Sequence, residues 1–379
     1  MTLIPDDDSP AESSSAGLVA VATDVGAWRV VEPVLRELRR RGLPCHPMLA
    51  EPSASIARQD GVPHTPLIGQ TVRDQAAQVL AARPTVLLLG TSVRAVVERE
   101  LTRLARLARP GIPTLAVLDA MLFVERRFGD GLLELADVVA CPDCATVERL
   151  RQAGAPATAL VATGNPTLEE IAQQAAQMSA SPGPVPVSQS AADGPVDVLF
   201  VSSPVASMRL RGAYFAIDER EALDDVLTAL ASLLSVAGSP AGPHGFSVRV
   251  RLHPVQQADA LPLPPPGITL ESDPDPDRLR SCARARIVVG LSSTLLAEAR
   301  FLPRTAIAYL PGPFWEQESV FAPEYGVQLA RSREQLHALL KTALLEPPPP
   351  PPTGHLGAAG RIADLLSALV PAQVRRSSL

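Results

Sequence analysis

The sequence lacks the features of a protein that spans a membrane or binds nucleic acid. Its longest uncharged apolar stretch, residues 227–238, is shorter than the roughly 18–20 residues that a transmembrane helix requires. Basic residues are outnumbered by acidic residues, 34 to 40, which gives a formal charge of −6. No general basic surface is therefore available for nucleic acid or an anionic membrane, and any bound phosphate must be held by local groups.

Cysteine and lysine are also scarce. Four cysteines in 379 residues do not form a disulfide framework, and no signal peptide is visible, so we expect a cytoplasmic protein. Cys141 and Cys144 have the spacing of a redox pair, but they do not follow the first strand of a domain, and no histidine nearby completes a metal site. We therefore expect neither a metal nor a cofactor. The single lysine, Lys341, indicates a GC-rich genome rather than a function.

Short apolar runs alternate with segments of helical periodicity along most of the chain. The runs are bounded by Gly, Pro or Asp, and most precede a stretch whose apolar residues recur at three- and four-residue intervals. Such alternation predicts parallel sheets that are covered by helices on both faces. The clearest runs are residues 18–23, 84–90, 113–119, 137–142, 197–203, 246–252, 286–291 and 305–311.

The length of the chain suits two domains rather than one. We predict an α/β protein with two doubly wound Rossmann-like domains, over residues 17–171 and 197–345, and a ligand cleft between them. Residues 172–196 are rich in Ser, Pro, Gly and Gln, which predicts a linker. Composition predicts three further segments: a disordered tail over 1–16, a polyproline spacer over 346–355, and a C-terminal helix over 356–371 that docks back on the body.

One strand of the second domain ends at a histidine suited to phosphate binding. Pro254 ends the strand and turns His253 toward the predicted cleft, and Arg251 lies two residues earlier. An imidazole in this position can share a proton with phosphate oxygens. Ser202 and Ser203 end the first strand of the same domain, and we expect their hydroxyls near the same phosphates.

A hydroxyl-rich turn forms the second candidate phosphate site. Ser292, Ser293 and Thr294 separate a predicted strand from a helix, where hydroxyls and free backbone N–H groups favour an anion. The same residues also suit an N-cap, a role that needs no ligand. The presence of the first candidate site, at His253, favours phosphate binding over N-capping for residues 292–294.

The order of these motifs resembles the C-terminal domain of GT-B glycosyltransferases. A strand, His-Pro, about forty residues, a strand, Ser-Ser-Thr and a helix with an acidic residue are similar to the bacterial sialyl- and polysialyltransferase and glycerophosphotransferase groups. In the N-terminal half, residues 164–166, Gly-Asn-Pro, resemble the end of the GT-B N-domain. The resemblance implies that His253 and residues 292–294 hold the phosphates of a nucleotide donor and that Glu298 holds its ribose.

The chain is also similar to the non-hydrolysing nucleotide-sugar 2-epimerases, which carry His-Pro followed by Asp-Ser-Gly-Gly and Glu-Glu-Ala. Here residues 290–294 read Gly-Leu-Ser-Ser-Thr, without the paired glycines. The first loop reads Thr23-Asp24 where those epimerases have Gly-Thr-Arg-Pro-Glu, so their phosphate-binding arginine is missing. Both differences favour a transferase.

The resemblance implies a metal-independent glycosyltransferase of polysaccharide biosynthesis. It would transfer a sugar, or a glycerophosphate, from a nucleotide-activated donor to a glycan, a lipid-linked or a small-molecule acceptor. Such a transferase needs a base near the acceptor hydroxyl, and Asp24 and Asp119 lie at suitable strand ends, although the first could simply cap a helix and the second simply end a strand.

Two alternatives stay open: a UDP-sugar 2-epimerase, and a nucleotide-sugar-binding protein without activity. The epimerase would interconvert a free donor without any acceptor, whereas the binding protein would hold a nucleotide and never convert it. The sequence does not identify the base, sugar or acceptor, and it leaves a homodimer and a peripheral association with membranes open.

Overall fold

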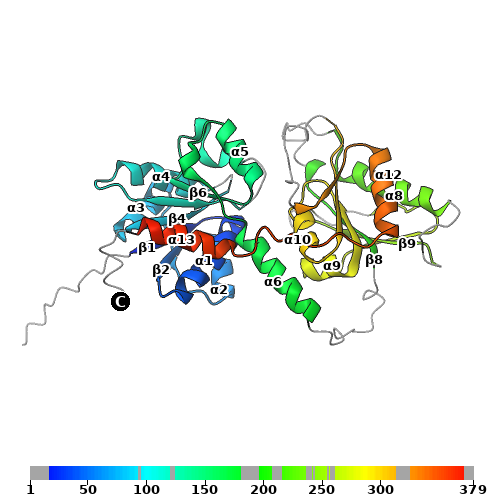
Figure 1. Cartoon of the computed structure of the whole chain (residues 1–379), viewed down its shortest axis with the longest axis horizontal. Helices are drawn as coiled ribbons and strands as arrows, with labels where there is room; N and C mark the ends of the chain where they lie inside the picture. Colours follow the sequence, from blue (N-terminus) through cyan, green and yellow to red (C-terminus); the bar gives the residue numbers. More distant parts are fainter. Residues whose placement is uncertain are drawn as a thin grey trace, which may run out of the picture.

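The computed structural model describes residues 17–92, 95–119, 124–180, 196–206, 216–235, 241, 244–253, 256, 261–312 and 325–370. These residues form two α/β domains, each built on a parallel sheet (Figure 1). The predicted tail and residues 181–195 of the predicted linker lie outside the described residues.

The N-terminal domain contains a seven-stranded parallel sheet in the order β3-β2-β1-β4-β5-β6-β7. Its strands are β1 (Leu18–Ala22), β2 (Cys45–Leu49), β3 (Thr65–Pro66), β4 (Val86–Gly90), β5 (Thr114–Val117), β6 (Val138–Cys141) and β7 (Leu160–Ala162). The helices are α1 (Val25–Arg40), α2 (Ser53–Gln59), α3 (Val72–Ala81), α4 (Val96–Leu107), α5 (Cys144–Gln152) and α6 (Pro166–Ala180), with short 3₁₀ turns η1 (Glu125–Phe128), η2 (Asp130–Leu132) and η3 (Ala157–Ala159).

The C-terminal domain contains a six-stranded parallel sheet in the order β10-β9-β8-β11-β12-β13. Its strands are β8 (Val196–Val201), β9 (Phe246–Arg251), β10 (Ile268–Ser272), β11 (Ala285–Gly290), β12 (Thr305–Tyr309) and β13 (Gln328–Ala330). The helices that follow are α8 (Glu219–Leu234), α9 (Arg278–Arg284), α10 (Leu295–Phe301), α12 (Arg333–Leu345) and α13 (Ala358–Leu369).

The predicted fold class is confirmed, because both sheets are doubly wound. The strand order reverses between β1 and β4 in the first sheet and between β8 and β11 in the second, and ligands bind at such points in open α/β sheets. Every residue of β1, β4 and β5 is buried, since helices cover both faces of the sheet. This burial explains why these strands appear in the sequence as continuous apolar runs rather than as alternating ones.

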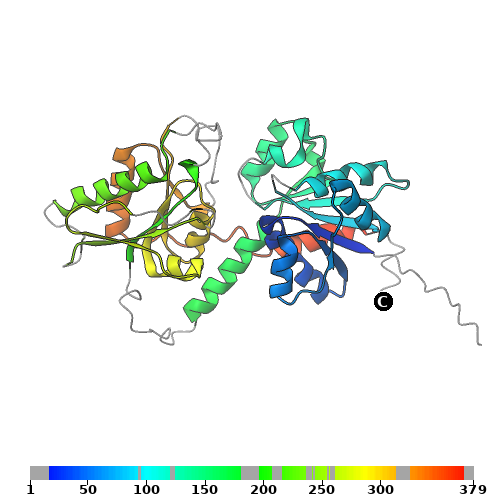
Figure 2. The ribbon, with the colours of Figure 1, turned by 180° about the vertical axis from the view of Figure 1, so that it is seen from behind.

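Each domain contributes a helix that packs on the other. Leu168, Ile171 and Ala175 of α6 belong to the hydrophobic core of the C-terminal domain. Conversely, Ile362 and Leu366 of α13 lie in the core layer that contains α1 and β1 of the N-terminal domain. Figures 1 and 2 show α6 reaching toward α9 and α10, and α13 lying against α1 and β4.

Two details differ from the sequence-based expectation. The linker was expected from residue 172, but α6 continues to Ala180, because its apolar side chains are buried on the other domain. The predicted spacer does lie between α12 and α13, but it is not a solvated connector throughout. Arg300 donates hydrogen bonds to the carbonyls of Pro349 and Pro350, at 3.1 and 2.6 Å, and His355 is only 2% exposed.

None of the helices among these described ranges is long and apolar enough to cross a bilayer. This agrees with the sequence, whose apolar stretches are too short to span one.

Candidate functional site

Three carboxyl groups gather at the carboxyl ends of β1 and β5 and in the first turn of α4. Asp24 caps α1, and its Oδ1 accepts a hydrogen bond from Gly26 N at 2.9 Å. Asp119 follows β5, and a Cβ atom on Gly26 would lie 2.4 Å from Asp119 Oδ2. Only glycine therefore lets the start of α1 approach Asp119 this closely. Both predicted bases thus lie at one place in the fold, and Asp24 also has the plain capping role.

Asp119 is held in position by two neighbours. The Arg127 guanidinium forms an ion pair with its Oδ1, and Thr91 Oγ1 donates to the same oxygen at 3.3 Å. Burial raises the pKa of Asp119 to about 6, although Arg127 acts in the opposite direction and the charge of Asp24 adds to the rise. The carboxyl is therefore more basic than an ordinary aspartate and still mostly ionised at pH 7.

Glu98, in the first turn of α4, was not found by sequence reasoning. Its carboxylate accepts hydrogen bonds from Thr23 N at 2.8 Å and from Thr23 Oγ1 at 2.9 and 2.8 Å. Burial raises the pKa of Glu98 to about 7, against the effect of these hydrogen bonds. Glu98 thus fixes the loop that carries Asp24. In the sequence it looks like an ordinary polar position in an amphipathic helix, and its 3% exposure is a property of the fold alone.

The predicted phosphate-binding loops of the C-terminal domain are joined by a carboxylate. Glu219, the first residue of α8, accepts from Ala206 N at 2.8 Å and from Gln256 Nε2 at 2.9 Å. Gln256 in turn accepts from His253 N at 2.9 Å. Glu219 therefore links the loop after β8 to the turn after β9, the turn that carries His253. Partial burial lowers the pKa of His253 below its usual value.

The four serines of the predicted phosphate sites have different surroundings. Ser202 and Ser203 are buried, and Ser202 N donates to Arg251 O at 2.9 Å, which continues the pairing of β8 with β9. Ser293 Oγ accepts from Leu295 N at 3.3 Å in the turn before α10, and Ser292 is partly exposed. Thr294 is the N-cap residue of α10, but it is exposed and its side chain makes no capping hydrogen bond. The capping role that was considered for this turn is therefore not performed by the Thr294 side chain.

Arg251, which was predicted to hold substrate, has protein partners for its guanidinium. NH1 donates to Asp273 Oδ2 at 2.6 Å and to Ser281 Oγ at 3.0 Å, and NH2 donates to the carbonyl of Pro276 at 3.1 Å. These bonds join the ends of β9 and β10 to α9. The geometry thus supports a role for Arg251 in shaping the site.

Glu298 lies at the junction of the two domains. Its carboxylate is 2.7 Å from Arg278 Nε and is buried. Arg29 of α1 interacts with the same pair: burial and the Arg278 guanidinium lower the pKa of Arg29, and Glu298 acts in the opposite direction. Arg29 is five residues after Asp24, about 7 Å along a helix. At this junction, α1 of one domain therefore lies within electrostatic range of α9 and α10 of the other, with two guanidinium groups and one carboxylate.

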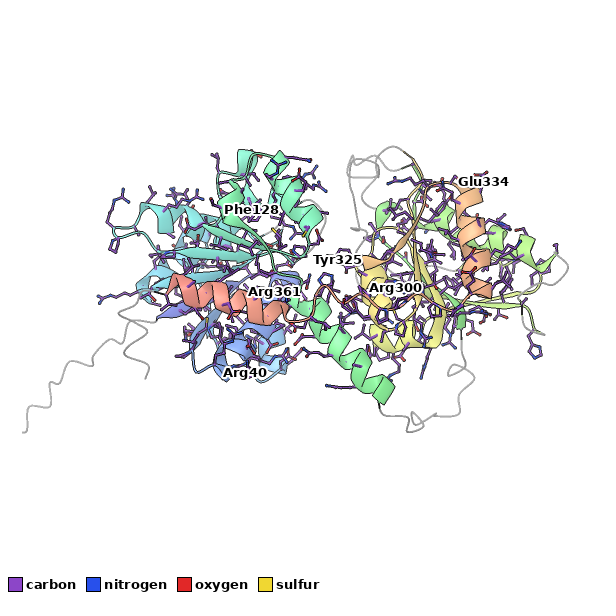
Figure 3. All side chains as sticks on the ribbon, viewed as in Figure 1. Arg40, Phe128, Arg300, Tyr325, Glu334 and Arg361 are labelled. Atoms are coloured by element: carbon purple, nitrogen blue, oxygen red, sulfur yellow. The ribbon has the colours of Figure 1, made fainter. Side chains whose placement is uncertain are left out.

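A second group of residues joins the domains on one side of this junction. Tyr325 is fully buried, and its hydroxyl donates to Asp143 Oδ2 at 2.7 Å; Figure 3 shows it between the domains. The ring of His355 stacks on Tyr325 with centroids 4.9 Å apart, and His355 Nδ1 accepts from Asn165 N at 3.1 Å. Asn165 Nδ2 donates to the carbonyl of Asp119 at 3.4 Å. The interdomain contact thus reaches the residue proposed as a base.

A metal centre is not formed by the residues that the structure describes, since nowhere do three His, Cys, Asp or Glu side chains group so as to hold an ion. Cys141 and Cys144, the pair with redox-type spacing, are both free thiols, and burial raises the pKa of Cys141 to about 12. A thiol that holds its proton this strongly is not a reactive nucleophile.

Comparison with solved structures identifies the fold. A UDP-GlcNAc 2-epimerase from Methanocaldococcus jannaschii is 12% identical with a TM-score of 0.61, over 93% of this chain and 99% of that one. The Neisseria meningitidis enzyme, bound to UDP-GlcNAc, is 12% identical with a TM-score of 0.59, over 93% and 100%. The chain has a GT-B-like fold. The glycosyltransferase of kitacinnamycin is 15% identical with a TM-score of 0.54, over 94% and 99%.

At the level of sequence, no protein-family model matches the chain, and a search of curated proteins finds no match. The similarity to the epimerases and to the glycosyltransferase is therefore one of architecture, extending over nearly the whole length of both chains.

Proposed function

We propose that this chain is a GT-B enzyme that acts on a nucleotide-activated sugar at the junction of its two domains. One observation carries the proposal: the carboxyl groups of Asp24 and Asp119 lie at the start of α1, and Arg29 of the same helix interacts electrostatically with Arg278 and Glu298 of the other domain. This arrangement supports a site that combines charge compensation for phosphate with a base for proton transfer, on a fold whose neighbours include a structure bound to UDP-GlcNAc.

In this proposal the C-terminal domain holds the donor. His253 and the hydroxyls of Ser292, Ser293 and Thr294 bind the phosphates, and Glu298 binds the ribose, with Ser202 and Ser203 beside them. Fixed donors aimed at the leaving group stabilise the charge that develops on it, and losing one such donor typically lowers the rate about 10²–10³-fold. We propose that these groups compensate the charge without a metal or a cofactor.

Two arginines add to this donor site. Arg278 pairs with Glu298, and the exposed Arg29 interacts electrostatically with both, so two guanidinium groups and one carboxylate give this group a net positive charge. A diphosphate is the anion that best suits two guanidinium groups, since each can form two parallel hydrogen bonds to phosphate oxygens. Arg29 thus supplies the guanidinium that the first loop lacks. We propose that Arg251 positions the loops around this site.

The base in this proposal is a carboxylate of the N-terminal domain. Asp119 suits the role because a general base is most effective when its pKa lies near the working pH, and the pKa of Asp119 is raised to about 6. Asp24, which shares the same corner, is the alternative. Glu98 does not reach the substrate in this scheme; it holds Thr23 and thereby the loop that carries Asp24.

The two candidate reactions, transfer and epimerisation, use the same donor site but release different products. Transfer is favoured by the first loop and by the missing glycines after Ser292, and epimerisation is favoured by several of the structural neighbours. We propose transfer as the reaction. The acceptor would be a glycan, a lipid-linked sugar or a small molecule.

The experiment is incubation with UDP-GlcNAc in D₂O, monitored by ¹H NMR, with and without a panel of sugar acceptors. Transfer releases UDP only when an acceptor is present. Epimerisation needs no acceptor and must break the bond from C2 to hydrogen, which allows solvent deuterium to enter. The Asp119→Asn variant should lower either rate about 10²-fold or more, whereas Asp137→Asn, a carboxyl that pairs with Thr114, should not. Binding without either product would show that the chain is a binding protein.

A further inference from the structure

A cavity of about 700 Å³ lies at the amino-terminal edge of the C-terminal sheet, opposite the proposed donor site. It is lined where β8, β9 and β11 begin, by residues that include Asp197, Ser247 and Arg286. The carboxyl ends of the same three strands carry the predicted phosphate-binding loops. A cavity of this volume falls within the range of small-molecule sites, roughly 300–1,000 Å³.

The lining is rich in positive charge although the protein as a whole is acidic, with a formal charge of −6. Three guanidinium groups, of Arg284, Arg286 and Arg304, border the cavity together with His244. One carboxylate, that of Asp197, borders it as well. The positive charge at this edge is therefore local and exceeds the negative charge around the cavity.

The Asp197 carboxylate is already bonded to its own neighbour. Its Oδ2 accepts from Ser247 N at 2.8 Å and from Ser247 Oγ at 3.0 Å, and Asp197 N donates to Ser247 Oγ at 2.9 Å. These three bonds hold the starts of β8 and β9 together. Asp197 forms no ion pair with the cavity arginines at 4.0 Å or less, so it does not neutralise them.

Two of the arginines have no carboxylate partner among the described residues. Arg286 donates one side-chain hydrogen bond, from NH2 to the carbonyl of Leu344, and Arg304 donates one from NH2 to the carbonyl of Ala283 at 2.6 Å. A guanidinium has five N–H donors, so each group has donors beyond the one that it uses, and the buried Nε of Arg304 has no partner among the described residues. Arg284, in contrast, lies 3.4 Å from Asp275 Oδ2.

The anchoring bonds also explain why the two guanidinium groups are suited to a ligand. Each is held by a carbonyl at the end of a helix, α12 for Arg286 and α9 for Arg304, so its direction is fixed before anything binds. A fixed guanidinium loses less conformational freedom on binding a phosphate than a mobile lysine would. The partial burial of Arg304, which lowers its pKa, means that its charge is also incompletely solvated.

The rest of the lining combines the polar side chain of Thr269 with Ala283 and with the buried Phe246, which is only 1% exposed and belongs to the core beneath the cavity. Inorganic phosphate alone would fill only a small part of a cavity of about 700 Å³. We propose that the cavity binds a small organic phosphate, with its phosphate group on Arg286 and Arg304 and its body in the remaining space beside Thr269. A nucleoside monophosphate and a sugar phosphate share this chemistry, and both are related to a nucleotide sugar, although the site stands independently of the proposed function.

The experiment is isothermal titration calorimetry at constant ionic strength with three probes: inorganic phosphate, UMP and glucose 6-phosphate. The test protein is the double variant Arg286→Gln/Arg304→Gln. Arg280→Gln is the matched control, because Arg280 is an arginine of α9 that does not line the cavity. His253→Ala is the control for the proposed donor site. The melting temperature of each variant without ligand reports whether it is folded.

The proposal expects UMP or glucose 6-phosphate to bind at the cavity, at least tenfold more weakly in the double variant and with unchanged affinity in Arg280→Gln. Because UMP is also a ligand for the proposed donor site, only binding that persists in His253→Ala counts for the cavity. Whichever probe binds identifies the source of the phosphate. Three results would overturn it: no binding of either monoester, binding that is lost only in His253→Ala, or a double variant that melts earlier but binds equally well. The last result would mean that Arg286 and Arg304 only stabilise the C-terminal ends of α12 and α9.

Discussion

At the scale of single residues, the clearest feature is a pair of buried carboxyl groups with raised pKa values. The pKa of Glu98 is raised to about 7 and that of Asp119 to about 6, and in both cases burial is the largest cause. The folded protein therefore holds these protons more tightly than the unfolded chain does. Each group consequently stabilises the fold at low pH, and that contribution is lost as the pH rises through the raised value.

The first prediction concerns this pH dependence. Glu98→Gln keeps a hydrogen-bonding partner for Thr23 but removes the titration, so the fall in unfolding free energy between about pH 4.5 and pH 7 should become shallower. At about 1.4 kcal/mol per pKa unit, the rise from 4.5 to about 7 makes the difference at pH 8 roughly 3 kcal/mol in favour of the variant. Urea unfolding at pH 5, 6, 7 and 8 measures it.

Glu100→Gln is the control, because Glu100 lies on the same helix and its partly exposed carboxylate has a pKa lowered by the hydrogen bond from Arg103. Its replacement should not make the slope shallower. A Glu98→Gln protein with the slope of the wild type would contradict the account of this residue.

At the scale of helices and strands, the domains are joined by buried polar contacts as well as by packing. Tyr325→Phe removes the hydroxyl that donates to Asp143, and leaving that carboxylate oxygen without a donor costs about 1–3 kcal/mol. Tyr309→Phe is a matched control, since Tyr309 OH donates to Asp225 at 2.8 Å within the C-terminal domain. Hydrogen exchange should show weaker protection on both sides of the junction for the first variant, and in the C-terminal domain alone for the second.

The helix α13 provides a second prediction at this scale. Ile362 is fully buried in the layer formed by α1 and β1, so Ile362→Ala should destabilise the N-terminal domain by about 2–5 kcal/mol. The exposed Leu356, just before α13, is the control position, and Leu356→Ala should change stability little. Thermal unfolding monitored by Trp28, which is buried in the same layer, reports the loss. Equal melting temperatures for both variants would show that α13 is not part of this core.

How far the sequence predicts these elements depends on how local their causes are. Strands such as β1 and β4 were predictable because burial on both faces requires continuous apolar runs, and α8 was predictable from its periodicity. The extent of α6 was not, because its last turns among residues 172–180 are polar in composition and are stabilised by packing on a domain that comes later in the chain.

In the candidate site, too, the residues with local sequence signals were predictable, and those placed by distant contacts were not. Asp24, Asp119 and Ser293 were found because each lies at the end of an apolar run or within two residues of it. Glu98 and Arg29 were missed because nothing in the sequence distinguishes them from other charged positions on a helix. Their roles follow from burial and from partners up to 75 residues or a whole domain away.

At the scale of the whole molecule, each domain contributes a helix that packs on the other, α6 on the C-terminal domain and α13 on the N-terminal domain. We propose that a nucleotide binds at the junction between them. The strand order of each sheet and the similarity to structures of GT-B-like epimerases and a glycosyltransferase establish the architecture. The chemistry is carried by a few side chains. The central claim is therefore that His253 and Ser293 contact a bound nucleotide.

Calorimetric titration with CMP, CDP, UDP and GDP tests this claim most directly, on the wild type and on His253→Ala and Ser293→Ala. His337→Ala is the matched control, because His337 lies on α12 and lines neither the proposed donor site nor the cavity at the other edge of the sheet. The account predicts that one nucleotide binds, that both donor-site variants weaken it about tenfold or more while melting as the wild type does, and that the control leaves it unchanged. Failure of every nucleotide to bind, or binding that ignores both substitutions, would contradict it.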